Sequence, residues 1–399
     1  MKGNMISGIV GNSLPLAPDF ALSLGTAPVD GQLISATNDV DAIKEWISRY
    51  AHSPNTVAAA RKDAERFYLW ITERGLPLRA VRKSDCEDYR EFLRDPQPAE
   101  HWCGPSKPRH MKDGSNNPEW RPFVGPLKDS SIRQTCTQIF GLYEFLCNAG
   151  YVPGNPWRLL GKLPPPEEEQ EDFFERFLER DALDALRRYI ETMQDGNKID
   201  KKHYDRVRWI FSALYLSGVR RSEFVNAKMN SIRRVKGKWW WKVKGKGGVT
   251  GNVPVNEEMM AELMSYRTSL GLAPLPSPDD ETPMVSDVSG KLRPITASAL
   301  YKLVKQVLNN AAIHTEKTGN LEAANNLRRA STHWMRHTSA TDQVNVPGAD
   351  IKMVSKNLRH ANISTTMRYV HVEHQARHNQ TQGHQLWEND KVESPSDID

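Results

Sequence analysis

The stretch STHWMRHT at residues 331–338 decides what kind of protein this chain can be. His333 and Arg336 are three positions apart within it, which places both on one face of a predicted helix. Three further stretches belong to the same pattern: SGVRRSE at 217–223, LRH at 358–360 and TTMRY at 365–369. Two arginines, two histidines and a tyrosine chosen from these stretches are the groups that can hold a phosphodiester and attack it without a metal ion.

Cleavage of a phosphodiester adds negative charge to its nonbridging oxygens. Arginine suits these oxygens, because it stays protonated and its planar fork matches two of them. Arg336 lies within the predicted helix. Arg220 stands at a predicted helix start after Gly218, and its neighbour Arg221 is the alternative.

Tyr369 is the candidate nucleophile. A tyrosine has an ordinary pKa near 10, so it needs a base or a strongly positive site to react near neutral pH. His333 can accept the phenolic proton, and His360 can donate a hydrogen bond to a phosphate oxygen.

The leaving 5′-oxygen needs an acid. Lys246 lies in a glycine-rich predicted hairpin turn and is the candidate, with Lys244 and Lys242 as alternatives. Glu223, one turn after Arg220, can orient an arginine through a charged hydrogen bond. Each residue alone also has an ordinary explanation as a surface, core or turn residue, and only their joint pattern favours an active site.

Length and composition limit the class of protein. The chain has 399 residues, enough for two or three domains, with 38% hydrophobic and 26% charged residues and a mean hydropathy of −0.63. There is no apolar run of the roughly 20 residues that a membrane helix needs. The N-terminal apolar residues are interrupted by two prolines and an aspartate, which argues against a signal peptide. Four widely spaced cysteines without a C-x-x-C pair favour a cytoplasmic protein.

The charge distribution favours a polyanionic partner such as DNA. The net charge is only +5, but residues 173–378 contain 33 Lys and Arg against 21 Asp and Glu. The acidic residues gather on either side of this segment. A basic, solvated surface without a partner is the alternative explanation.

Composition shifts predict the domain organisation. Residues 164–172, PPPEEEQED, form the clearest boundary, because prolines stiffen this linker and like charges extend it. From the N-terminus, the expected segments are a flexible arm at 1–37, a helical domain at 38–163 with a proline-rich insertion at 96–128, the linker, a second domain at 173–387 and an acidic tail at 388–399. In the insertion, His101, Cys103 and His110 lack the second close pair that a structural zinc site needs, so no metal is expected.

Periodicity predicts mainly helices with one small antiparallel sheet. Ser53-Pro54 and Gly75 bound the second helix, Ser84 with Glu87 forms a capping box for the third, and Asp129 or Ser130 caps the fourth. Of Trp239, Trp240 and Trp241, one or two are expected to pack on helices rather than stack on bases. The predicted helices are 39–50, 57–74, one from 84, 132–148, 180–193, 203–217, 257–270, 296–312, 323–344 and 349–358, and the predicted strands are 232–235, 239–243 and 252–255.

In four of these stretches the chain resembles the tyrosine recombinases, also called the phage integrase family. Residues 216–224 resemble the family's T-G-L-R-x-S-E-L, and 358–371 resemble L-G-H-x-x-I-x-T-T-x-x-Y-x-H. The stretch HWMRHT, followed by Ala340-Thr341, resembles H-x-L-R-H-T-x-A-T, and Gly245-Lys246-Gly247 resembles the hairpin lysine segment. The resemblance covers roughly residues 38–380.

The resemblance implies a two-domain clamp on double-stranded DNA, with a helical core-binding domain and a mixed α+β catalytic domain. It implies cleavage and rejoining through a 3′-phosphotyrosyl intermediate without metal, cofactor or ATP. Four protomers would form the synapse, the segment after Tyr369 would dock on a neighbour, and an accessory DNA-bending or directionality protein is possible in this family. The roles implied by position are Tyr369 as nucleophile, His333 as general base, Lys246 as general acid, Arg220, Arg336 and His360 as phosphate activators, and Glu223 as a supporting residue.

The sequence departs from the family pattern at three positions. Arg359 stands where the family usually has Gly, and Val249 and Gly251 stand where the hairpin often has Lys or Arg. The N-terminus is also too short for the β-rich arm-binding domain of some integrases, which favours a simpler recombinase acting at core sites.

Two other functions remain open from the sequence. One is relaxation of DNA in the manner of a type IB topoisomerase, and the other is a DNA-binding regulator without strand exchange. The presence of all six catalytic candidates argues against the regulator. The sequence does not distinguish integration, excision, resolution and transposition of a mobile element.

Overall fold

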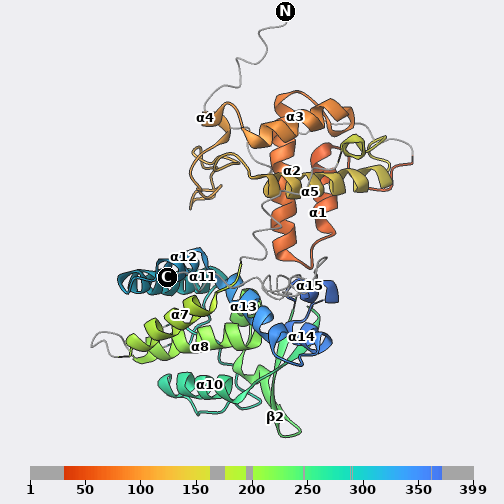
Figure 1. The fold of residues 1–399 in the computed structure, drawn as a ribbon. Helices are drawn as coiled ribbons and strands as arrows, with labels where there is room; N and C mark the ends of the chain where they lie inside the picture. The colour runs from red at the N-terminus through yellow and green to blue at the C-terminus, as the bar shows by residue number, and fades with distance from the viewer. Residues whose placement is uncertain are drawn as a thin grey trace, which may run out of the picture. The chain divides into compact units, whose positions relative to one another are not determined.

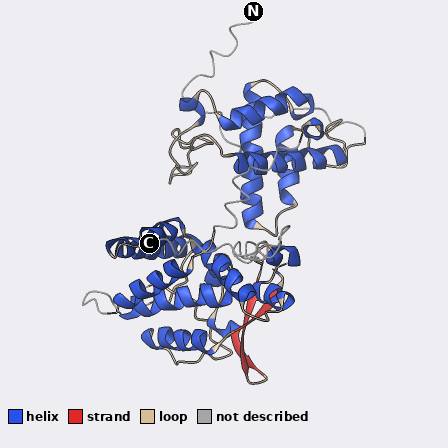
Figure 2. Ribbon diagram, in the orientation of Figure 1, coloured by secondary structure: helices blue, strands red, loops and turns tan. Residues whose placement is uncertain are grey.

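The computed structural model describes residues 31–161, 176–194, 201–245, 248–287, 289, 291–360 and 362–370. The chain divides into two compact units, residues 1–169 and 170–399 (Figure 1). Its described part is mainly helical with one three-stranded antiparallel sheet (Figure 2), so the predicted fold class is confirmed. The predicted linker, the acidic tail, Lys246 and most of the predicted arm lie outside the described residues.

The N-terminal unit is a helical domain with an aromatic core. Phe67 lies at its centre and makes edge-to-face contacts with Tyr89, Tyr143 and Trp157. Such ring pairs stabilise a core beyond the area that they bury. Its elements are α1 Asp39–Ser48, α2 Pro54–Glu73, η1 Leu78–Ala80, α3 Lys83–Arg94, α4 Ala99–Trp102, α5 Asp129–Asn148 and η2 Pro156–Leu159.

The boundaries of α2 are confirmed, whereas two predicted caps are wrong. Ser53 precedes Pro54 at the start of α2, and Gly75, at φ +65°, follows its end. For α3, the helix begins one residue earlier than the predicted Ser84 cap, and Asp85 accepts from the backbone N–H of Arg82 at 2.7 Å. The shorter aspartate occupies the third helical position and fulfils the role predicted for Glu87.

The α5 helix begins at the first of its two predicted cap residues, Asp129 and Ser130, so neither of them precedes the helix as a cap. Asp129 is the first helical residue, after the extended Lys128, and so its carboxylate lies in the positively polarised first turn.

The proline-rich insertion at 96–128 is part of the core of this unit. Trp102 and Phe123 are each 1% exposed and both contact Phe92. Their backbones are joined by a bridge between Cys103 and Phe123. The Nε2 atom of His101 lies 2.5 Å from a carboxylate oxygen of Glu73 on α2. The insertion therefore closes one side of the helical domain.

The C-terminal unit packs helices around α8, with the sheet to one side. Helix α8 contacts α7, α10 and α13 (Figure 1). None of the described helices is both long enough and apolar enough to cross a membrane. The elements are α7 Arg180–Thr192, α8 Lys201–Ser217, α9 Arg221–Val225, η3 Met229–Ser231, β1 Ile232–Val235, β2 Lys238–Lys244, β3 Thr250–Pro254, α10 Glu257–Ser269, α11 Ala297–Lys317, α12 Leu321–Arg329, α13 Thr332–Asn345, α14 Ile351–Leu358 and α15 Ile363–Met367.

The sheet has the order β1-β2-β3, and both pairs are antiparallel. Trp241 on β2 pairs with Ile232 and Val253 and is fully buried, with its ring edge-on to Phe224. Packing on a helix is therefore confirmed for this tryptophan. The strands fall within two residues of their predicted bounds.

The predicted single helix at 323–344 is wrong, because the chain breaks at Ala330 and Ser331. Both residues are extended, and the Ser331 side chain caps α13 by accepting from His333 N–H. Lys305 on α11 donates to the carbonyl of Ala330 at 2.9 Å and also to that of Arg328. This lysine satisfies carbonyls that the end of α12 leaves without helical partners. Elsewhere, α11 runs five residues past its predicted end.

Candidate active site

Arg336 is the buried centre of the site. Its side chain lies on α13, one turn after His333, and the residue is 4% exposed. The guanidinium donates to the carbonyl of Gly218, after α8, and to that of Leu358, at the end of α14, the latter at 2.6 Å. Arg336 thus joins three segments that are far apart in the sequence.

Gly218 permits this close approach. Its φ of +58° is in the left-handed region, where a side chain is strained. A Cβ atom there would also lie 2.6 Å from a methyl carbon of Leu358. Only glycine fits this position, and the turn that it makes leads directly into Arg220.

Arg220 is held by Glu223. Its backbone N–H donates to Oε2 of Glu223 at 2.8 Å, and its guanidinium donates to Oε1 at 2.9 Å. The Arg220 side chain remains 43% exposed, whereas that of Glu223 is 3% exposed. The neighbouring Arg221 instead lies over the ring of Tyr301, 5.4 Å from its centroid. The structure thus separates the two arginines that the sequence left as alternatives.

Arg359 reaches the same carboxylate from the end of α14. It adopts the left-handed backbone conformation at φ +55°, which glycine populates far more readily than residues with a side chain. Its guanidinium donates to Oε2 of Glu223 at 2.6 Å and to the carbonyl of Asn357 at 3.0 Å. In the described part of the site, Arg220 and Arg359 therefore share the carboxylate of Glu223, whose charge also acts on the nearby Arg336.

The aromatic rings of the site are linked by pairwise contacts. The His360 ring is nearly parallel to that of Tyr369, with centroids 6.0 Å apart. The ring of His337 contacts both Tyr369 and His333, with centroid distances of 5.4 Å and 4.3 Å. Nδ1 of His360 is 2.8 Å from the hydroxyl of Thr366. Tyr369 itself is 5% exposed.

Burial and the arginines determine the protonation states of the imidazoles. Burial, followed by the charges of Arg336 and Arg220, lowers the pKa of His360 to about 4. Although His333 reaches the surface, partial desolvation and the same two arginines lower its pKa as well. Both rings are therefore neutral near pH 7.

The pKa values of Tyr369 and Glu223 are shifted in opposite directions. Burial raises the pKa of Tyr369 above its ordinary value, although Arg336 and Arg220 act in the opposite sense. Burial alone would also raise the pKa of Glu223, but the charge of Arg359 and the hydrogen bonds from Arg220 outweigh it, and the pKa is lowered. Desolvation and the other arginines lower the pKa of Arg336 to about 10, which leaves it charged at neutral pH.

Lys246 lies outside the described residues, between β2 and β3. The residues beside it close the hairpin turn: Gly245 donates its N–H to the carbonyl of Val249 at 2.8 Å. A Cβ atom on Gly245 would lie 3.4 Å from Oε1 of Glu223, so the start of this turn is beside the site. The alternatives Lys242 and Lys244 are exposed on β2.

Two residues of this cluster, His337 and Arg359, had no role predicted from the sequence. His337 is four positions after His333 on the same helix face, a spacing that could have revealed it. Arg359 was visible only as a departure from the family pattern. Its contact with Glu223 spans 136 residues of sequence, so no local signal indicated it.

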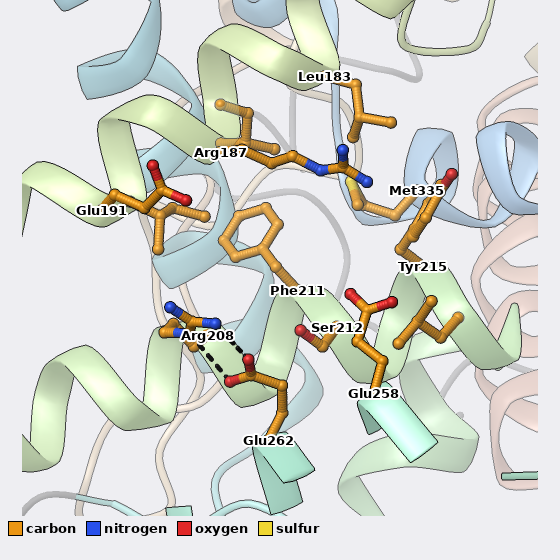
Figure 3. A pocket seen from close by; sticks show the side chains of 13 residues that line it. Leu183, Arg187, Glu191, Arg208, Phe211, Ser212, Tyr215, Glu258, Glu262 and Met335 are labelled. Carbon is orange, nitrogen blue, oxygen red and sulfur yellow. Dashed lines mark hydrogen bonds and ion pairs between the residues drawn. The ribbon is translucent and has the colours of Figure 1, made fainter. Parts of the chain in front are cut away.

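A separate cavity of about 230 Å³ lies beside α8 (Figure 3). Residues of α7, α8 and α10 line it, and Met335 of α13 completes it. Arg208 and Glu262 form an ion pair across one side, with Nε of Arg208 2.9 Å from the carboxylate. None of the candidate catalytic residues lines this cavity.

Comparisons with known proteins identify the family. The phage integrase family model matches residues 176–376, just over half of the chain. Tyrosine recombinase XerC of Chlorobaculum parvum is 26% identical over 337 residues, covering 80% of this chain and 85% of that protein. Tyrosine recombinase XerD of Staphylococcus aureus is 25% identical over 320 residues, with coverage of 80% and 88%.

Solved structures show the same fold. The site-specific recombinase XerH, bound to palindromic difH substrate in a post-cleavage complex, aligns with a TM-score of 0.58 at 16% identity. The alignment covers 89% of this chain and 86% of that one. At this level of identity the likeness concerns the fold alone.

The fold, the clustered arginines and histidines and the buried tyrosine define a DNA strand transferase that uses tyrosine. The chain belongs to the phage integrase family, the tyrosine recombinases. The predicted family and enzyme class are confirmed.

Proposed function

We propose that this tyrosine-type site-specific recombinase cleaves and rejoins double-stranded DNA at specific core sites through a 3′-phosphotyrosyl intermediate. One observation carries the proposal. Arg220, Arg336, His360 and Tyr369 come from four segments that meet here: Arg336 donates to the carbonyls of Gly218 and Leu358, and the ring centroids of His360 and Tyr369 lie 6.0 Å apart.

The proposed step exchanges one phosphoester for another. The phenolic oxygen of Tyr369 attacks the scissile phosphorus and forms the new bond, while the bond to the 5′-oxygen breaks. The phenolic proton passes to His333, and the 5′-oxygen takes a proton from Lys246. A 5′-hydroxyl from the partner duplex then reverses the step, so neither ATP nor a metal ion is required.

The proposed phosphate ligands are Arg220, Arg336 and His360. Charge on the nonbridging oxygens grows during attack, and preorganised donors stabilise it most strongly where water is excluded. The exposed part of the Arg220 guanidinium is available to an incoming phosphate. His360 is neutral near pH 7 and can donate from the ring nitrogen that does not face Thr366.

The protonation states support His333 as the base. Because burial raises the pKa of Tyr369, the phenol carries its proton in the free chain at neutral pH. Because the pKa of His333 is lowered, its imidazole is free to accept that proton. A base whose pKa is below the working pH is already in its active form.

We also propose that both units bind the duplex, the helical unit through 38–163 and the catalytic unit through 173–387. In this proposal four protomers assemble on two DNA sites, and the segment after Tyr369 docks on a neighbouring protomer. The relative XerH is described as bound to its difH substrate, which supports DNA as the partner. The cellular role would be integration, excision or resolution of a mobile element, with or without an accessory DNA-bending protein.

Trapping of the covalent intermediate tests the nucleophile. Nicked duplexes tiled across the DNA that flanks the gene lose a short fragment after cleavage, which prevents religation. Wild type is expected to form an adduct that survives denaturation, and Tyr369→Phe is expected to form none. Tyr301→Phe, which alters a surface tyrosine on α11, is the matched control and should trap as wild type does.

The outcomes separate the possible functions. Adducts with Tyr369→Phe would exclude Tyr369 as the nucleophile. DNA binding without any adduct from wild type would favour the regulatory function. Adducts accompanied by relaxation of supercoiled plasmid, but without strand exchange between two duplexes, would favour the topoisomerase-like function.

A further inference from the structure

Arg359 is an arginine in an unusual setting. Its side chain is only 9% exposed, and its backbone is in the left-handed conformation. That conformation costs a residue with a side chain about 1–2 kcal/mol relative to the right-handed region. The residue thus bears both a desolvation cost and a backbone cost, and within the described residues its carboxylate partner is Glu223.

Glu223 is shared between two arginines. Its Oε2 atom accepts from the guanidinium of Arg359 at 2.6 Å and from the backbone N–H of Arg220 at 2.8 Å. Its Oε1 atom accepts from the guanidinium of Arg220 at 2.9 Å. One carboxylate can neutralise only one guanidinium. Because Arg359 is buried against Glu223 and Arg220 is exposed, the buried arginine takes most of the neutralisation.

We propose that Arg359 is a positioning residue that acts through Glu223 to keep the charge and orientation of Arg220 available for the scissile phosphate. The inference rests on the proposed function. Without Arg359, the buried carboxylate would have Arg220 as its nearest counter-charge and would draw that guanidinium inward. The exposed face of Arg220 would then present less positive charge to DNA.

Gly251 makes room for Arg359. A Cβ atom at Gly251 on β3 would lie 2.8 Å from Cδ and 2.9 Å from Cγ of Arg359, closer than such atoms approach in proteins. The stem of Arg359 therefore passes directly over this glycine. Two departures from the family pattern, arginine at 359 and glycine at 251, are therefore in contact, and the absence of a side chain at 251 leaves room for the arginine.

The first experiment separates cleavage from binding. Single-turnover cleavage of the nicked duplex that traps wild type is measured at saturating full-length protein, and affinity is measured on the same duplex. Arg359→Gln is expected to slow cleavage roughly 10- to 100-fold, the range for loss of one hydrogen bond between charged groups, with affinity changed less than about twofold. Arg359→Lys should recover part of the rate, because it retains the charge.

A matched control addresses loss of positive charge in general. Lys356 is exposed on the same helix, less than one turn before Arg359. Lys356→Gln removes the same charge without touching Glu223 and is expected to cleave at the wild-type rate.

A neutral phosphate distinguishes positioning from a purely structural role. In a duplex with a methylphosphonate at the scissile position, one charged oxygen is replaced by a methyl group. If Arg359 acts on the charge that Arg220 offers to the phosphate, the defect of Arg359→Gln shrinks on this substrate. A structural defect would slow both substrates by the same factor.

Gly251→Ala tests the contact itself. It is expected to slow cleavage in the wild-type background but to add no further loss in Arg359→Gly, since the clashing side chain is then absent. Equal cleavage rates for Arg359→Gln and wild type would overturn the positioning role of Arg359 but leave the proposed function intact. Additive effects of Gly251→Ala and Arg359→Gly would do the same. A wild-type chain that forms no adduct overturns the proposed function and this role with it.

Discussion

At the scale of single residues, the imidazoles of the site are kept neutral by their surroundings. Burial, together with His333 and Arg336, lowers the pKa of His337 to about 3, and His360 has a pKa of about 4. The ordinary value is 6.5. Between the lowered pKa values of the folded chain and the ordinary value of 6.5, these histidines are protonated in the unfolded chain but not in the folded chain. The free energy of unfolding therefore rises with pH in this window.

This difference predicts acid sensitivity of the catalytic unit. The stability that both histidines contribute is present above about pH 6.5 and is lost as the pH falls towards 4. Each such histidine contributes a slope of about 1.4 kcal/mol per pH unit in that window. His337→Gln should flatten the dependence by that amount, measured by urea unfolding at several pH values. Equal slopes for the variant and wild type would show that His337 titrates alike in both states.

Most candidate residues of the site could be named from the sequence. Arg336 and Tyr369 were identified from local motifs, because the residue types that phosphoryl transfer needs occur there at short spacing. The choice between Arg220 and Arg221 was not decided by spacing, since both are adjacent on the chain. It depends on Glu223 and Tyr301, which hold the two side chains in different places.

At the scale of elements, the break between α12 and α13 orients the helix that bears His333 and Arg336. Apolar periodicity runs through both helices, so the pattern predicted one. The break depends on Lys305, which lies on α11 and donates to carbonyls at the end of α12. A residue that acts from another element leaves no trace in the periodicity of the helices that it separates.

Removal of this lysine is therefore expected to destabilise the catalytic unit. Lys305→Met leaves buried carbonyls without their donor, a loss of about 1–3 kcal/mol in the free energy of unfolding. Lys302→Met, on the exposed side of the same helix, should change it by less than about 0.5 kcal/mol. Denaturant unfolding of both variants checks the difference. Equal stabilities would mean that the break does not need Lys305.

At the scale of the whole molecule, each unit contains its own hydrophobic core. The aromatic cluster around Phe67 belongs wholly to the N-terminal unit, and the core around α8 belongs to the other. A unit with a complete core can fold alone. The fragment 31–161 is therefore expected to be helical by circular dichroism and to unfold cooperatively. A gradual, non-cooperative transition would show that this unit needs the rest of the chain.

The sequence alone determined the fold class and the family, and it predicted the division near residues 164–172 and five catalytic candidates within the described residues. These features depend on periodicity, turn residues and spacings of a few positions, and short-range interactions leave such patterns in the sequence. Only the tertiary structure placed Trp102 and Phe123 of the insertion in a core, and only it brought Arg359 over Gly251 to Glu223. Contacts between distant segments depend on how whole elements pack, and packing is set by the shapes and charges of both partners together.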